Sequence, residues 1–241
     1  MKYVLSFITW FFSNPAATIA FFSATIALLA YRHQRKGMRK QNACQAAEKY
    51  AREILPRMRY IIKLLEFSGL HAINNKFTGF ALFTEKELND LLLKADCTEE
   101  NYRASVNKIK QEHLIEALAF SGANEYLYKQ HSVLLEISNT SDKLGEAVTR
   151  FIKDFLNDME AMATLLRYNI ADEKLIYQSL HQTFLKFMKH WYFYISDENR
   201  KDQDRFYSNT IWLYNHWNKR KCYDEMTIDR VLVMTTKAKR L

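Results

Sequence analysis

The segment Pro15–Tyr31 reads PAATIAFFSATIALLAY, and the basic segment Arg32–Lys40, RHQRKGMRK, follows it directly. The seventeen residues of the first segment carry no charge. As an α-helix they would extend about 26 Å, since each residue adds about 1.5 Å. The hydrocarbon core of a bilayer is about 30 Å thick. The sequence therefore predicts one membrane-spanning helix at about residues 15–31.

The basic residues after the predicted span indicate its orientation. They are Arg32, Arg35, Lys36, Arg39 and Lys40. Cytoplasmic flanks of membrane helices carry an excess of Lys and Arg, whereas residues 1–14 carry only Lys2 and the amino terminus. We therefore expect the N-terminus outside the cell and the residues beyond Lys40 in the cytoplasm. Anionic lipid headgroups would then bind these cations, each contributing about 1 kcal/mol.

The apolar segment could instead be a cleaved signal peptide or a buried core helix. A signal peptide has basic residues before its apolar run and a small-residue cleavage site after it. Here the basic residues follow the run, and Leu28, Leu29 and Tyr31 precede them. A buried core helix seldom lacks polar residues on every face over such a length. Both alternatives stay open, although each fits the sequence less well than a span does.

Small residues recur along the predicted span at intervals of three and four. They include Ala16, Ala20, Ala24 and Ala27. Small side chains allow two helices to approach closely within a bilayer, so this face predicts a homo-oligomer. Alanine is equally compatible with a solitary span, and that alternative stays open.

The composition predicts an all-α protein. The 241 residues include only five Gly and two Pro, which are too few turn residues for a many-stranded sheet. We expect a membrane anchor with its basic juxtamembrane segment at 1–40 and a helical stalk and connection at 41–79. A multi-helix cytoplasmic bundle should occupy 80–220, followed by a tail at 221–241.

Several local signals predict where helices begin, end or bend. Pro56 predicts a kink near Arg52, because the carbonyl of Arg52 loses its hydrogen-bond donor. The sequence Thr84–Glu87, TEKE, fits a capping box at the start of a helix. A further helix should begin at Thr98 and end at Ser121, where a glycine follows.

Apolar residues at steps of three and four predict two long helices, 148–168 and about 173–195, joined by Asn169–Asp172. So short a connection predicts an antiparallel hairpin. The apolar faces comprise Val148, Phe151, Ile152, Phe155, Met159, Met162 and Leu166, then Ile176, Leu180, Phe184, Phe187, Trp191 and Ile195. Asp197–Asp204 is predicted as a solvated turn, and Arg205–Lys219 as one more helix.

The net charge of +8 is concentrated beside the predicted span. Residues 1–66 hold eleven Lys and Arg against three Asp and Glu, and the remaining charges balance. Anionic lipid explains this basicity, so we expect no nucleic-acid partner. The seven His and three Cys lack the spacing of a metal site, and glycine-rich phosphate-binding motifs are missing. Asp154 and Asp158 share a helix face, which we interpret as solvated surface. We therefore expect no metal, no cofactor and no enzymatic activity.

Two motifs carry a family resemblance. FLNDMEAMATLLRYNIADEKLIYQSLHQTFLKFMKHWYFYI begins at Phe155, and a later helix ends in LYNHW at Trp217. Together with the anchor and its basic run, these motifs resemble the uncharacterised bacterial domain-of-unknown-function family number 4760. The likeness covers the anchor and about Thr149–Trp217. It implies a helical, membrane-tethered protein of bacteria or their prophages, and it implies no catalytic residues.

Two groups of side chains are candidates for a buried site. Asn157 and Glu160 belong to the F-L-N-x-x-E motif and stand three residues apart on one helix. We predict that they make a buried hydrogen bond within the hairpin. The second group could line a ligand pocket or belong to the core: His190, Trp191, Trp212, His216 and Trp217.

These features together predict a single-pass protein of the bacterial inner membrane. Its helical cytoplasmic domain would act by contact with an unidentified protein partner, as a scaffold, sensor or effector. The alternative is a prophage or anti-phage defence effector that perturbs the inner membrane when triggered. A ligand-binding enzyme comes third.

Overall fold

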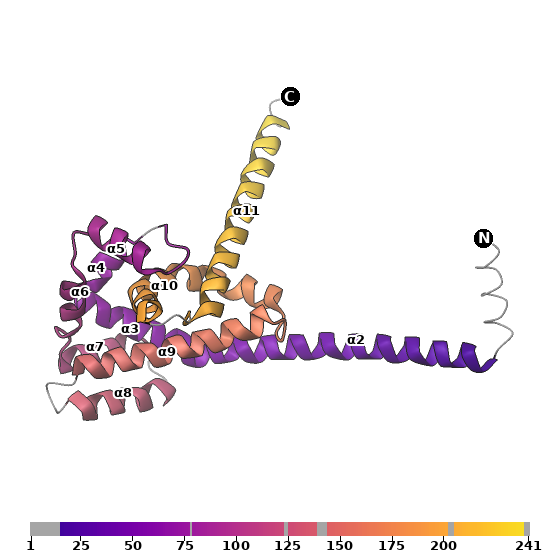
Figure 1. The fold of residues 1–241 in the computed structure, drawn as a ribbon, viewed down its shortest axis with the longest axis horizontal. Coiled ribbons are helices and arrows are strands. Elements are labelled where there is room, and N and C mark those ends of the chain that lie inside the picture. Colours follow the sequence, from indigo (N-terminus) through magenta and orange to yellow (C-terminus); the bar gives the residue numbers. More distant parts are fainter. Residues whose placement is uncertain (1–14, 78, 123–124, 139–143, 202–204, 239–241) are drawn as a thin grey trace.

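The computed structural model describes residues 15–77, 79–122, 125–138, 144–201 and 205–238. These residues form helices without a β-strand among them, so the predicted all-α class is confirmed (Figure 1). In chain order the helices are α2 (Pro15–Lys49), η1 (Tyr50–Ile54), α3 (Leu55–Phe67), α4 (Leu70–Asn74), α5 (Glu85–Lys94), α6 (Glu99–Val106), α7 (Gln111–Phe120), α8 (Glu125–Ser138), α9 (Leu144–Arg167), α10 (Glu173–Lys201) and α11 (Ser208–Ala238).

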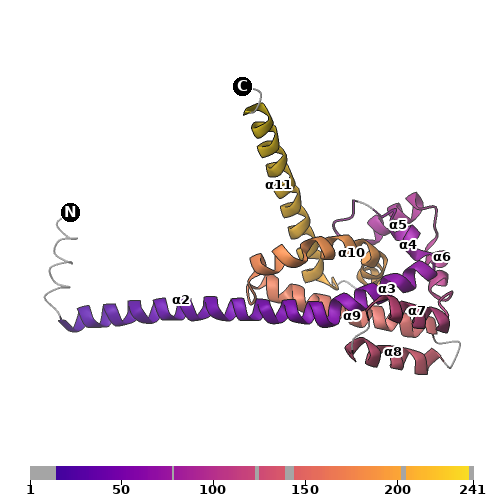
Figure 2. The same cartoon turned by 180° about the vertical axis from the view of Figure 1, so that it is seen from behind.

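One hydrophobic core joins these helices into a body, from which the N-terminal part of α2 and the later part of α11 project in different directions (Figures 1 and 2). The core extends from Ala43 to Trp217. It includes residues of the predicted stalk, since Tyr50, Met58 and Tyr60 are fully buried. The stalk segment is therefore packed as part of the body.

Helix α2 runs without a break from the apolar segment into the basic segment. Its N-terminal part lies away from the body in both views (Figures 1 and 2). Large apolar side chains are exposed along it: Ile19, Phe21, Phe22, Ile26, Leu28, Leu29 and Tyr31. None of the helices in the described part of the chain combines the length and the apolar character needed to cross a membrane. The helix predicted at 15–31 is thus present, but it does not meet the requirement for a span; Met1–Phe12 lies outside the described residues.

The helical hydrogen-bonding pattern changes just before Pro56. Residues Tyr50–Ile54 form a turn of π-helix, and the chain then continues as α3. Proline has no N–H to donate to the carbonyl of Arg52, four residues earlier, and single π-turns commonly accommodate such irregularities inside helices. The hydrogen-bonding irregularity expected near Arg52 is present as this π-turn, whereas the predicted kink stays a prediction.

The two long helices predicted near the C-terminus are α9 and α10. Every predicted apolar residue of α9 is buried, and so are Ile176, Phe184, Trp191 and Ile195 of α10. The connection turns through Asn169, which adopts a left-handed φ of 56°. Helix α11 packs against both α9 and α10. The buried faces of the hairpin are therefore shared with a third helix.

Two predicted segment boundaries are wrong. The helix predicted from Thr98 to Ser121 is divided into α6 and α7, because the chain turns at Asn107–Ile109 through short-range backbone hydrogen bonds. The solvated turn predicted to begin at Asp197 is instead helical, since α10 continues to Lys201. Asp197 is buried. Its charge is compensated by arginines that the local sequence pattern does not reveal.

Candidate functional site

The first turn of α11 is capped by Glu160 of α9. One carboxylate oxygen accepts hydrogen bonds from the backbone N–H and Nδ2 of Asn209, at 2.9 and 2.8 Å. The other accepts from the backbone N–H and Oγ1 of Thr210, both at 2.8 Å. The first N–H groups of a helix lack partners within it, and this helix end favours negative charge. Asn157 is exposed. The predicted bond between Asn157 and Glu160 is therefore wrong, because Glu160 binds the start of another helix.

A second carboxylate, Glu173 at the start of α10, holds α11 two turns later. It accepts a 2.8 Å hydrogen bond from Nε1 of the buried Trp217 and two from Nη1 of Arg220, at 3.1 and 3.0 Å. The Arg220 guanidinium lies 3.8 Å from the ring centroid of Tyr177. Glu160 and Glu173 together fix the N-terminal half of α11, so the two family motifs contribute to one structural joint.

His190 lies in the core rather than in an open pocket. It is 2% exposed, and its ring stacks on that of His71 of α4 with centroids 5.0 Å apart. Neither Nδ1 atom of this histidine pair has a hydrogen-bond partner. Burial lowers the pKa of His190 to about 4, and the charges of His71, Lys189 and Lys186 act in the same direction. His190 is therefore neutral at pH 7.

The predicted tryptophans lie in different places. Trp191 is buried against Phe155, with ring centroids 4.9 Å apart. Trp212 is half-buried and stacks on the exposed His216, with centroids 5.0 Å apart. Together with Trp217 at the Glu173 joint, these residues belong to the core and the surface. The structure does not gather the predicted group into one pocket.

Helix α2 joins the body at the connection between α9 and α10. The carbonyl of Arg39 accepts a 3.0 Å hydrogen bond from the N–H of Asp172, and Arg39 Nη2 donates to Oδ1 of Asn169 at 3.3 Å. Asn42 donates from Nδ2 to the carbonyl of Ile170 at 2.9 Å. The body therefore begins at the end of the basic segment.

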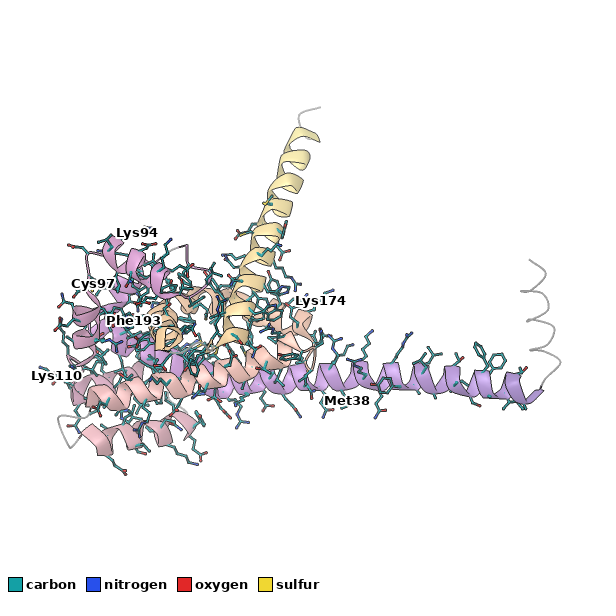
Figure 3. The ribbon with its side chains drawn as sticks, viewed as in Figure 1. Met38, Lys94, Cys97, Lys110, Lys174 and Phe193 are labelled. Atoms are coloured by element: carbon teal, nitrogen blue, oxygen red, sulfur yellow. The ribbon has the colours of Figure 1, made fainter. Side chains whose placement is uncertain are left out.

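The predicted lipid-binding cations lie at the surface. Four are exposed and Arg39 is partly covered, and none of the five forms an ion pair with a described residue: Arg32, Arg35, Lys36, Arg39 and Lys40. Figure 3 shows Met38, within this stretch, on the projecting helix, and Lys174 at the nearby edge of the body. The predicted small-residue face is also exposed: Ala16, Ala20, Ala24 and Ala27. Both surfaces are therefore available to partners.

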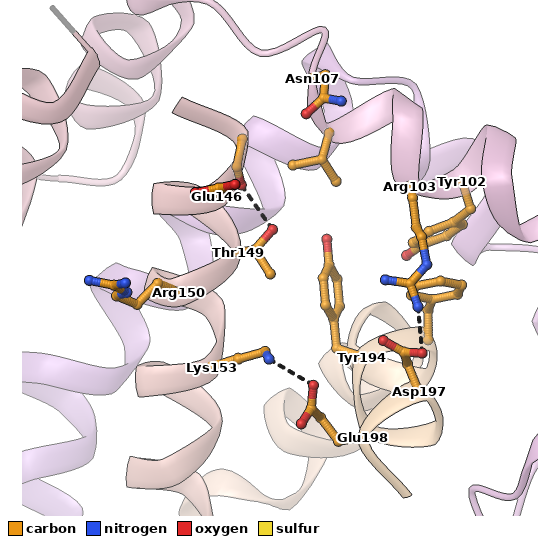
Figure 4. A pocket seen from close by; sticks show the side chains of 13 residues that line it. Tyr102, Arg103, Asn107, Glu146, Thr149, Arg150, Lys153, Tyr194, Asp197 and Glu198 are labelled. Carbon is orange, nitrogen blue, oxygen red and sulfur yellow. Dashed lines mark hydrogen bonds and ion pairs between the residues drawn. The ribbon is translucent and has the colours of Figure 1, made fainter. Parts of the chain in front are cut away.

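A cavity of about 450 Å³ lies between α6, α9 and α10 (Figure 4). Val106, Phe193 and Tyr194 supply apolar and aromatic surface. Six charged side chains line it, three of each sign: Arg103, Arg150, Lys153, Glu146, Asp197 and Glu198. No residue of the predicted site lines this cavity. The volume falls within the roughly 300–1,000 Å³ typical of small-molecule sites.

An ion-pair network closes one side of the cavity. Asp197 Oδ1 accepts from Nη2 of both Arg103 and Arg200, each at 2.5 Å. Glu99 of α6 accepts two hydrogen bonds from Arg200, at 2.6 and 2.7 Å, and one from Arg103 Nε at 3.0 Å. The hydrogen bond from Arg200 is the main cause that lowers the pKa of Glu99 to about 2. The network links α6 to α10, and its two basic side chains balance its two acidic ones.

Sequence reasoning missed this cavity and misread Asp158. Asp158 bonds to the buried Arg57 at 2.5 Å and to Lys49 at 3.0 Å, so it links α9 to the N-terminal helices instead of forming solvated surface. Arg57 and Asp158 are about a hundred positions apart in the chain. No local signal predicts such a pair. The described residues contain no group of three or more His, Cys, Asp or Glu side chains placed to hold a metal.

Comparison with known proteins places the chain in a family. A protein-family model described as a domain of unknown function, DUF4760, matches residues 17–217. The match spans nearly all of α2, every helix from η1 to α10 and the N-terminal part of α11 up to Trp217. No curated protein and no solved structure matches the chain.

Proposed function

The chain belongs to the DUF4760 family, and from this premise we propose that it is a bacterial inner-membrane protein acting by protein-protein contact. Residues 1–40 comprise the membrane anchor and the basic juxtamembrane segment, with the span at about residues 15–31 and the N-terminus outside the cell. The basic segment Arg32–Lys40 lies against anionic headgroups, and the body is cytoplasmic.

The exposed apolar surface of α2 carries this proposal. Phe21 and Ile26 are 56% and 66% exposed on a helix that projects from the body. Burying such a side chain contributes about 1.5–3 kcal/mol, and soluble monomers rarely leave large apolar patches uncovered. The basic segment Arg32–Lys40 follows directly, and its Lys and Arg side chains form no ion pair with a described residue. An apolar segment next to basic residues suits the boundary between acyl chains and headgroups.

Exposed apolar side chains on the body favour a protein partner. Ile115 and Phe120 of α7 and Tyr128 and Val133 of α8 are each more than half exposed. Helices α7 and α8 pack against each other. A partner that covers such side chains would form a more stable complex, because their apolar surface would be buried. We therefore propose that the cytoplasmic body is a docking module, as in a scaffold or sensor.

The exposed alanine face favours the second candidate function. A defence effector that perturbs the membrane must bring several N-terminal helices together, and Ala20 and Ala24 lie one turn apart on such a face. Triggered self-association in the membrane would then supply the activity.

A topology experiment tests the main proposal. A reporter enzyme that is active only outside the cytoplasm should work when fused before Met1 and fail when fused after Leu241. Changing Arg32, Arg35, Lys36, Arg39 and Lys40 to Gln should weaken this asymmetry, because the charge difference across the anchor disappears.

The control changes five exposed lysines of the body to Gln and should leave the asymmetry intact: Lys86, Lys94, Lys108, Lys110 and Lys129. A reporter that works at the C-terminus, or a chain recovered entirely without membranes, would contradict the proposal.

A further inference from the structure

Tyr194 is a buried hydroxyl that bonds to no described group. Its side chain is 7% exposed, and its Oη atom has no hydrogen-bond partner. In Figure 4 the ring of Tyr194 points its hydroxyl into the cavity, between Thr149 of α9 and Arg103 of α6. Leaving a buried polar group unpaired costs about 1–3 kcal/mol of stability. The unpaired hydroxyl therefore indicates that Tyr194 has a role other than stabilising the fold.

The surroundings of Tyr194 offer donors to a ligand. Burial raises the pKa of Tyr194, so the hydroxyl stays protonated at pH 7 and can donate. Arg103 uses Nε for Glu99 and Nη2 for Asp197. Its Nη1 makes no hydrogen bond to a described residue, and a guanidinium can only donate. Two donors beside one cavity favour a ligand with an oxygen acceptor.

The charges around the cavity favour an uncharged ligand. Lys153 pairs with Glu198 at 2.7 Å, and Arg103 and Asp197 belong to the balanced network with Glu99. An added anion would meet three acidic side chains as well as three basic ones. The stacked rings of Phe193 and Tyr102, with centroids 3.9 Å apart, give the cavity a flat aromatic surface.

We propose that this cavity binds an uncharged, flat small molecule that presents a carbonyl oxygen to Tyr194 and Arg103. Water has almost no access to the Tyr194 hydroxyl. A ligand therefore reaches it only after a wall side chain other than Arg103 moves aside, because Arg103 is held by Glu99 and Asp197. The site lies in the body, apart from the exposed surfaces that carry the proposed docking function.

The test uses 4-fluorobenzamide as the probe and the full chain in a neutral detergent. Its fluorine resonance should broaden with the parent protein. Tyr194→Phe keeps the shape of the side chain and should weaken binding about 5- to 10-fold, the equivalent of one hydrogen bond. The same variant without probe should melt at a higher temperature, because the unpaired hydroxyl is gone. The anion 4-fluorobenzoate should bind the parent more weakly than the amide.

Two tryptophan variants locate the binding. Val106→Trp fills the cavity and should abolish the broadening of the fluorine resonance. Val133→Trp alters the exposed wall of a neighbouring cavity between α8 and α9, so the broadening should stay unchanged. No broadening with the parent, unchanged affinity in Tyr194→Phe, a lower melting temperature in Tyr194→Phe, or tighter binding of the benzoate would each overturn the proposal. An equal loss of broadening in both tryptophan variants would also overturn the proposal.

Discussion

At the scale of single residues, the buried and partly buried polar groups described above are of two kinds. Glu160 and Glu87 accept several hydrogen bonds each, the latter from the N–H groups of Ala81–Thr84 and from the Tyr192 hydroxyl. The histidine pair is of the other kind, since both Nδ1 atoms lack partners. Satisfied carboxylates stabilise turns and helix starts, whereas an unsatisfied buried imidazole makes stability depend on pH.

The pKa of His190 predicts that the protein becomes less stable in mild acid. The pKa is about 4 in the folded chain against an ordinary 6.5, so the unfolded chain binds more protons between these values. The free energy of unfolding that the neutral His190 contributes is fully present above pH 6.5. It is lost as the pH falls toward 4, by roughly 3 kcal/mol in total. Urea unfolding at pH 7 and pH 5 would measure part of this loss.

Two variants assign the effect to this residue. His190→Phe cannot titrate and should show a smaller fall in unfolding free energy between pH 7 and pH 5. His33→Gln changes an exposed histidine on the projecting part of α2 and should keep the parent's fall. An undiminished fall in His190→Phe would contradict the assignment.

At the scale of helices, α11 is positioned by side chains from two other helices. Glu160 caps its first turn and Glu173 binds Trp217 and Arg220. Beyond this joint the helix leaves the body (Figure 1). The family motif F-L-N-x-x-E therefore has a structural role, since its last residue holds the closing helix.

Removing the charge of Glu160 should loosen α11. Glu160→Gln keeps the size but weakens the hydrogen bonds to Asn209 and Thr210 and the favourable interaction with the helix N-terminus, so we expect a loss of about 1–2 kcal/mol. Chemical denaturation measures this loss, and hydrogen exchange in the first turns of α11 should accelerate.

Asp154→Asn is the matched control, because this exposed carboxylate lies on the same helix and pairs with no described residue. It should change stability by less than about 0.5 kcal/mol. Equal effects of the two variants would show that the cap contributes nothing.

At the scale of the whole molecule, the body and the projecting helix present different surfaces. The body buries one continuous core, while the N-terminal part of α2 exposes its apolar residues and its alanine face. Hydrogen bonds at Arg39 and Asn42 fix α2 to the connection between α9 and α10. Any association of the projecting helices would therefore bring the bodies together as well.

Bulky residues on the alanine face should disrupt that association. Ala20→Ile and Ala24→Ile would hold two helices apart while keeping the segment apolar, so crosslinking between copies in native membranes should fall severalfold. Phe22→Leu and Ile26→Leu alter neighbouring exposed residues and serve as controls with unchanged crosslinking. Crosslinking as strong as the parent's in both alanine variants would exclude this face.

The sequence by itself determined the helical class, the Thr84–Glu87 capping box, the disturbance before Pro56 and the buried faces of α9 and α10. Each depends on neighbours within a few positions, and helical periodicity reports such neighbours directly. Only the tertiary structure decided the partners of Glu160, Asp158 and Asp197 and the cavity beside Tyr194. Those contacts join residues that are mostly about fifty or a hundred positions apart. The local sequence around a charged residue does not reveal so distant a partner, so such a residue is predicted to lie at the surface.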